Sequence, residues 1–119
     1  MTNMQRRHLL ALAVLTAVPA PASAHAILMA SAPRHAARLP AGAHALTLRF
    51  NSRLDLARSR LTVLRPDKSP EILTLLPGSD DVLSANATLT PGPHTLRWQV
   101  LALDGHITRG EVPFSVTAP

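Results

Sequence analysis

The strongest candidate for chemistry in this sequence is His25, because of the segment that precedes it. His25 directly follows Ala22-Ser23-Ala24, which has the pattern of a signal-peptide cleavage site. Cleavage there makes His25 the first residue, and its α-amine and imidazole Nδ1 can then close a chelate ring on one metal ion. An α-amine ordinarily has a pKa of about 7.7–8.0, so the loss of its proton is easy near neutral pH. His25 is therefore predicted to offer two nitrogen ligands where an internal histidine offers one.

A second candidate is the segment Asp104-Gly105-His106, which places a carboxylate and an imidazole two residues apart. In an extended segment such residues point to the same side, and Gly105 has no side chain to obstruct an approaching ion. Combined with His25, the set contains three nitrogens and one oxygen. Tetragonal coordination by nitrogen and oxygen is the preference of Cu(II), which also has the highest affinity of the divalent series. These residues favour a Cu(II) site, although Ni(II) would fit the same ligands.

Each of these patterns also has an ordinary structural interpretation. A histidine can follow a cleavage site by coincidence, and Asp-Gly-His is typical of a turn in which Asp caps and Gly adopts positive φ. The other histidines of the mature chain are interpreted as structural: His35 and His44 as surface residues, and His94 as a partly exposed residue that begins a strand. From spacing alone, both the metal site and the plain turn remain open.

Residues 1–24 have the features of a cleaved signal peptide. Arg6 and Arg7 form a basic start, and residues 9–18 form an apolar run that ends at prolines. A membrane-spanning helix needs about 20 apolar residues, so this run is too short to be one. We therefore expect the mature protein to be residues 25–119, a single exported domain that does not span the membrane.

The composition of residues 25–119 excludes several classes of site and partner. No cysteine is present, which excludes thiolate zinc sites and iron–sulfur clusters. The ten Lys or Arg residues outnumber the seven Asp or Glu residues, but the bases are scattered along the chain. Single-stranded nucleic-acid binding uses basic grooves with interleaved aromatics, and only Phe50, Trp98 and Phe114 are aromatic here. No nucleic-acid partner is expected.

Short alternating runs of apolar and polar residues, separated by proline and glycine, predict an all-β fold. In residues 45–50, for example, Leu46, Leu48 and Phe50 share one face. Period-two alternation with frequent turn signals favours an antiparallel β-sandwich of about seven strands. Pro113 predicts an edge or a bulge in the last strand, because proline cannot donate to a ladder. The predicted core consists of Leu46, Leu48, Phe50, Leu61, Val63, Leu96, Trp98, Val100, Phe114 and Val116.

Several segments, in order, resemble the CopC family of copper-resistance proteins. The sequence His-Ala-Ile-Leu-Met-Ala-Ser-Ala-Pro after the cleavage site is similar to the start of the mature family members. The strand that ends in Phe, a Pro-Gly-x-x-x-Leu-x-Trp strand, and the final Asp-Gly-His, Gly and Phe-x-Val pattern are similar too. In this sequence they are residues 25–33, 46–50, 91–100, 103–106, Gly110 and 114–116. The resemblance covers nearly the whole mature chain.

The resemblance implies an immunoglobulin-like Greek-key sandwich that acts in the periplasm in copper sequestration, tolerance or delivery. It implies Cu(II) ligation by His25 through both nitrogens, by Asp104 and by His106, and a CopD-like inner-membrane protein as a partner. We expect a monomer. Some members carry a Glu near the metal where this chain has Ser52, so no fourth side-chain ligand is expected. Others bind Cu(I) through a Met-rich loop, but Met29 is the single methionine of residues 25–119, so no Cu(I) site is expected.

Two other functions compete with copper binding. Copper held by an N-terminal His also occurs in oxidative polysaccharide-cleaving enzymes, which need an open coordination position and a flat, often aromatic, substrate face. The short chain, its few aromatics and a direct Asp104 ligand argue against an enzyme. The second alternative is a metal-free sandwich that serves as an interaction module. We expect a binding protein that is not an enzyme.

Overall fold

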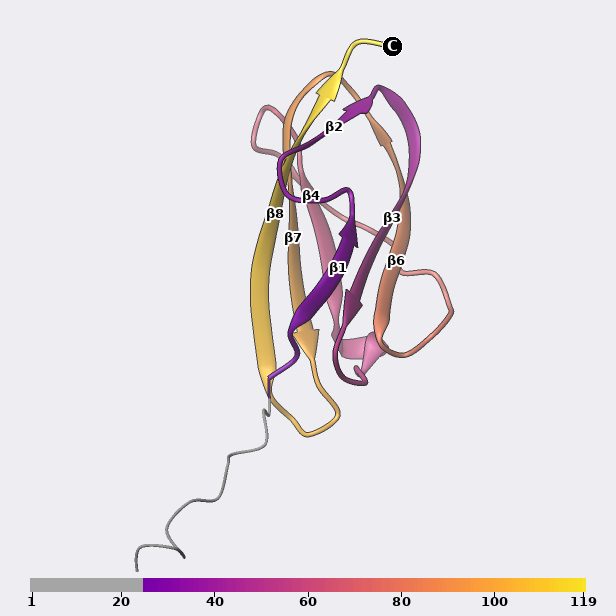
Figure 1. Ribbon diagram of the computed structural model, residues 1–119, viewed down its shortest axis with the longest axis vertical. Helices are drawn as coiled ribbons and strands as arrows, with labels where there is room; N and C mark the ends of the chain where they lie inside the picture. The colour runs from indigo at the N-terminus through magenta and orange to yellow at the C-terminus, as the bar shows by residue number, and fades with distance from the viewer. Residues whose placement is uncertain (1–24) are drawn as a thin grey trace, which may run out of the picture.

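The computed structural model describes residues 25–119, which form two facing β-sheets (Figure 1). The predicted signal peptide, residues 1–24, lies outside the described residues. One sheet has the order β1-β3-β6 and the other has the order β2-β8-β7-β4-β5. The strands are β1 (Leu28–Ala32), β2 (Ala37–Pro40), β3 (Gly42–Phe50), β4 (Arg60–Leu64), β5 (Pro70–Ile72), β6 (Val82–Leu89), β7 (Gly92–Leu101) and β8 (Ile107–Thr117).

The predicted all-β sandwich is confirmed. The chain changes sheets at every connection from β1 to β4, between β5 and β6, and again between β6 and β7. Pairs such as β3 with β6 and β4 with β7 are antiparallel, as in Greek-key sandwiches, and only β2 pairs in parallel, with β8. Eight strands occur among the described residues. A single 3₁₀ turn, η1 (Leu56–Arg58), lies between β3 and β4. No helix within residues 25–119 is long and apolar enough to cross a membrane.

The core lies between the sheets, where the alternating apolar faces meet. All ten residues predicted for the core are buried. Phe50 from one sheet meets Trp98 from the other edge to face, with ring centroids 5.0 Å apart. Such aromatic pairs add about 0.5–1.5 kcal/mol to the contribution of their burial. Leu83 and Leu89 of β6 extend the same core.

Pro113 lies where β8 changes from an edge strand to an interior one. The Pro113 carbonyl accepts a hydrogen bond from the Ala36 N–H at 2.7 Å, and β2 then pairs with Phe114–Thr117. In an extended strand, the nitrogen and the carbonyl of one residue face the same side, so the Pro113 nitrogen faces away from β7. No ladder bond to β7 is lost, which agrees with the predicted edge position.

The prediction that His94 is partly exposed is wrong. Its side chain is buried, and its ring stacks on Phe114 with centroids 5.4 Å apart. His94 Nδ1 lies 3.0 Å from the Gly92 carbonyl oxygen, whereas Nε2 is buried without a hydrogen-bond partner among the described residues. The alternation that gave Leu96, Trp98 and Val100 one face applies to His94 as well, so it belongs to the core.

Gly110 permits the central aromatic packing. It pairs with Trp98 across β7 and β8, and a Cβ at Gly110 would lie 2.3 Å from Cζ2 of the indole. The ring is enclosed in the core and cannot swing away, so any larger residue has to displace it. The packing of Trp98 therefore explains why β8 has a glycine at position 110.

We expect Gly110→Ala to lower the free energy of unfolding by about 1–3 kcal/mol, the usual cost of overpacking a core. Urea denaturation followed by Trp98 fluorescence measures it. Gly78→Ala is the matched control, because a Cβ at Gly78 has no atom within 4 Å. Equal effects at the two positions would contradict this account of Gly110.

We expect His94→Phe to leave the unfolding free energy unchanged or to raise it, because it removes a buried nitrogen that lacks a partner and keeps the stack on Phe114. Phe114→Ala in the same assay should lower it by about 3–5 kcal/mol. A large destabilisation by His94→Phe would mean that the bond from Nδ1 to Gly92 is the main contribution of this residue.

Candidate metal centre

The segment between β7 and β8 is a tight hairpin loop that holds Asp104 and His106. The Ala102 N–H donates to the His106 carbonyl at 2.9 Å, and the Gly105 N–H donates to the Ala102 carbonyl at 2.9 Å. Gly105 has φ +94, a backbone conformation that favours glycine. Its role in this sequence is therefore the turn itself, in addition to leaving space beside the two polar side chains.

The Asp104 carboxylate binds both the backbone and the ring of His106. Oδ1 accepts a hydrogen bond from the His106 N–H at 3.1 Å and lies 3.2 Å from Nδ1 of the imidazole. The hydrogen bond from the His106 backbone, more than any other interaction, holds the pKa of Asp104 below its usual value, and the nearby His25 also lowers it. Both side chains are about half exposed, so the carboxylate is ionised and accessible near neutral pH.

His25 lies against this loop, although about eighty residues separate the two in sequence. The His25 and His106 rings meet edge to face with centroids 5.4 Å apart. Figure 1 shows the beginning of the described chain and the β7–β8 loop at the same end of the sandwich. The three residues predicted to bind metal are therefore brought together: Asp104 contacts His106, and His106 contacts His25.

Asn51 positions the N-terminal segment, and sequence reasoning did not identify it. Its side-chain Oδ1 accepts a hydrogen bond from the Ile27 N–H at 2.7 Å, and its own N–H donates to the Ile27 carbonyl at 3.0 Å. The neighbouring Ala26 is buried. The only sequence signal is that Asn51 follows the strand-ending Phe50, since nothing in the local pattern links it to a residue 24 positions earlier.

The remaining polar residues near this end are engaged elsewhere or are distant. Asp55 is the acidic residue nearest in sequence to Ser52, the position at which some members of the CopC family carry a Glu. Its carboxylate lies 3.5 Å from Arg58 in an ion pair. His44 Nε2 lies 2.6 Å from the Pro40 carbonyl oxygen, and His35 is exposed in a turn, as predicted for surface residues. His94 lies at the opposite end of β7 from the loop.

Among residues 25–119, no group of three or more His, Cys, Asp or Glu side chains is arranged to hold a metal ion. In this chain the α-nitrogen of His25 is part of the peptide bond to Ala24, so one of the four predicted donors requires the predicted cleavage. The two imidazoles and the carboxylate form a cluster, and they do not form a complete ligand set in the uncleaved chain.

Comparisons with known proteins agree with this architecture. A family model described as CopC domain matches residues 28–117. The protein YobA of Escherichia coli K12 is 30% identical over 121 residues, which cover 97% of this chain and 97% of YobA. YobA of Shigella flexneri matches with the same identity and the same coverage.

Solved structures share the fold. CopC from Methylosinus trichosporium OB3b superposes with a TM-score of 0.71 at 23% identity, covering 79% of this chain and 95% of that chain. PcoC, a methionine-rich copper resistance protein from Escherichia coli, has a TM-score of 0.64 at 24% identity and covers 79% of this chain and 100% of its own. The family model spans most of the described residues, and the relationship to YobA extends over almost the whole chain. This chain is therefore a member of the CopC domain family.

Proposed function

We propose that this protein is exported to the periplasm, where residues 25–119 bind one Cu(II) ion for sequestration, tolerance or delivery. Three residues hold the ion: His25, through its α-amine and imidazole, Asp104 and His106. The observation that carries the proposal is the meeting of His25 with the β7–β8 loop, where the two imidazole rings lie 5.4 Å apart and Asp104 contacts His106. The membership of the CopC family supports the same conclusion.

The chemistry of the donors suits Cu(II). Removal of residues 1–24 frees the α-amine, and the set then contains three nitrogens and one oxygen, the donor types of tetragonal Cu(II) sites. The contacts of the Asp104 carboxylate with His106 both use Oδ1, so Oδ2 can bind the ion while Oδ1 holds the loop. A carboxylate beside a ligating imidazole also orients the ring. The turn interpretation and the metal interpretation of Asp104-Gly105-His106 are thus compatible.

Residues 25–119 contain few ligands of the kind that Cu(I) prefers. Cu(I) prefers thioether and thiolate ligands. Residues 25–119 contain no cysteine and one methionine, Met29, whose side chain is exposed on β1. The neighbour PcoC is described as methionine-rich, which this chain is not. We therefore propose a single Cu(II) site without a Cu(I) site.

The surface favours binding over catalysis. Phe50, Trp98 and Phe114 are all buried, so the described residues offer no exposed Phe, Trp or Tyr to a polysaccharide chain. A ligand set of three nitrogens and one carboxylate also fills the four strong positions of a tetragonal ion. We propose that the protein is a monomer, that it is not an enzyme, and that a CopD-like membrane protein is its partner in copper transfer.

His106→Ala should weaken Cu(II) binding to the mature protein by about 100-fold or more, because it removes a ligand and the partner of Asp104. Isothermal titration with a competing chelator measures the change. His35→Ala, which removes an equally accessible histidine from a surface turn, should leave the affinity unchanged. Equal losses in both variants would indicate dispersed, adventitious binding and would contradict the ligand assignment.

A further inference from the structure

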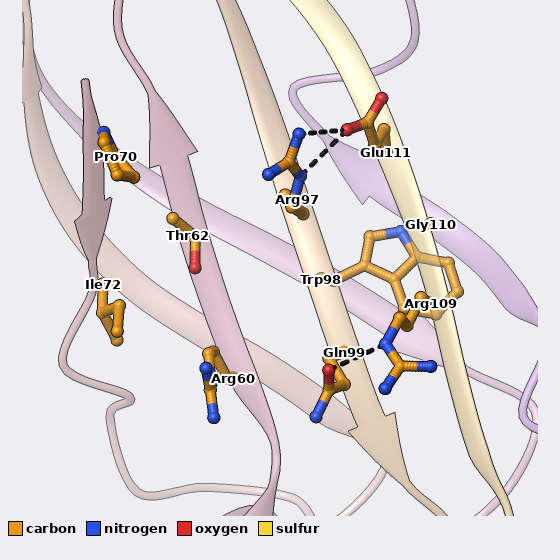
Figure 2. Close-up of a pocket in the computed structure, with 10 residues that line it drawn as sticks. All are labelled: Arg60, Thr62, Pro70, Ile72, Arg97, Trp98, Gln99, Arg109, Gly110 and Glu111. Carbon is orange, nitrogen blue, oxygen red and sulfur yellow. Dashed lines mark hydrogen bonds and ion pairs between the residues drawn. The ribbon is translucent and has the colours of Figure 1, made fainter. Parts of the chain in front are cut away.

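The outward face of the five-stranded sheet contains a groove of about 840 Å³ that no other strand or turn of residues 25–119 covers (Figure 2). The alternation of β4, β7 and β8 sends Leu61, Trp98 and Val112 into the core and the intervening residues outward. The strand register aligns Arg60, Gln99 and Arg109 in one row across the sheet. The next row contains Ile72, Thr62, Arg97 and Glu111.

The groove carries excess positive charge. Arg60, Arg97 and Arg109 line it together with one acid, Glu111, so its net charge is +2. Glu111 is already bound by Arg97, whose Nη2 lies 2.9 Å from the carboxylate. Arg109 donates to the Gln99 Oε1 at 2.9 Å, a neutral acceptor, and the Arg60 side chain has no hydrogen bond or ion pair with any residue of 25–119. Two guanidinium groups therefore lack a counter-charge in the groove.

The groove is concave and has one apolar side. Thr62 faces outward from β4 and lies among the other labelled side chains of the groove (Figure 2), and yet it is only 8% exposed. Pro70 and Ile72 of β5 line the side opposite Arg109, and Ile72 is 65% exposed. A ligand that fills the groove would meet guanidinium groups and an apolar wall at the same time.

The apolar wall is also a free sheet edge. In the order β2-β8-β7-β4-β5, strand β5 pairs only with β4, so its other side has no strand neighbour within the described part of the chain. Unpaired backbone groups at a sheet edge can bond to an added extended segment, which is a common mode of peptide recognition. The edge lies directly beside the arginine rows.

We propose that this groove docks an extended, acidic segment of a partner protein, with carboxylates on Arg60 and Arg109 and an apolar side chain against Ile72. Charge complementarity and the mixed lining carry the proposal. A flat bilayer surface does not match a concavity whose floor residue is buried. Nucleic-acid bases would need exposed aromatic side chains, and Phe50, Trp98 and Phe114 are all buried.

The groove and the metal centre share one hairpin. β8 begins at Ile107, immediately after His106, and Arg109 follows three residues later, about 10 Å along the strand. A protein docked in the groove would therefore lie beside the proposed copper site. The docking itself requires no copper, so it can be tested independently of the proposed function.

The test uses the mature protein and a fluorescein-labelled peptide of sequence Glu-Glu-Ile-Glu-Glu-Ile-Glu-Glu. Fluorescence anisotropy should show binding that weakens with added salt, and the same peptide with Gln in place of every Glu should not bind. The Arg60→Gln/Arg109→Gln double variant should weaken binding by about fivefold to tenfold. In nuclear magnetic resonance spectra, the peptide should shift amide signals of β4, β5 and β7.

The matched control is Arg38→Gln/Arg49→Gln, which removes the same charge from exposed arginines outside the groove and should leave peptide affinity nearly unchanged. Equal weakening by the two double variants would overturn the groove as the site. Absence of peptide binding, or binding only to vesicles that contain phosphatidylglycerol, would overturn the acidic segment as its occupant. Cu(II) affinity of Arg60→Gln/Arg109→Gln should equal that of the unsubstituted protein, which separates this result from the proposed function.

Discussion

The two hydrogen bonds between Ile27 and Asn51 decide where the first residue of the domain lies. Chain termini are usually poorly ordered unless something ties them down, and a terminal metal ligand is of little use if it has to be ordered when the ion binds. Here the segment is fixed on both sides of Ile27, and the burial of Ala26 adds an apolar contact. His25 is then held against the β7–β8 loop before any ion arrives. The proposed metal centre depends on this anchoring.

The β7–β8 hairpin connects the remaining features of the molecule. Its inner face contributes Trp98, which packs on Phe50 and over Gly110, and so joins the two sheets. Its outer face contributes Arg97 and Arg109 to the groove, and its loop contributes Asp104 and His106 to the proposed metal centre. This pair of strands therefore contributes to the core, to the proposed copper site and to the proposed docking surface, and strand alternation keeps the core face apart from the groove face.

The sequence predicts the features that follow from local alternation of apolar and polar residues and from the chemical types of the candidate ligands. The ten predicted core residues are buried, and the residues proposed as ligands come together at one end. The prediction of a partly exposed His94 is wrong. A polar residue at the start of a strand is usually exposed, but here the alternating face of β7 and the stack on Phe114 outweigh that tendency. The sequence of β1, Leu28–Ala32, has no regular alternation, and its pairing with β3 shifts register between Leu28 and Ala30.

What the sequence could not predict depends on register between distant strands. Arg60, Arg97 and Arg109 look scattered along the chain, and only the pairing of β4, β7 and β8 gathers them in one groove. The role of Asn51 likewise depends on a contact across 24 residues. Neither feature has a local signature in a single sequence.

The role of His25 as the anchor of the ion is tested by Cu(II) titration, followed by electron paramagnetic resonance, of two forms of residues 25–119. One form begins with a free amine at His25, and the other carries one additional residue before it. We expect that only the first form binds one Cu(II) tightly, with a nitrogen-rich tetragonal spectrum. If both forms bind alike, or neither binds, His25 does not anchor the ion, and the metal-free interaction module becomes the better description of this protein.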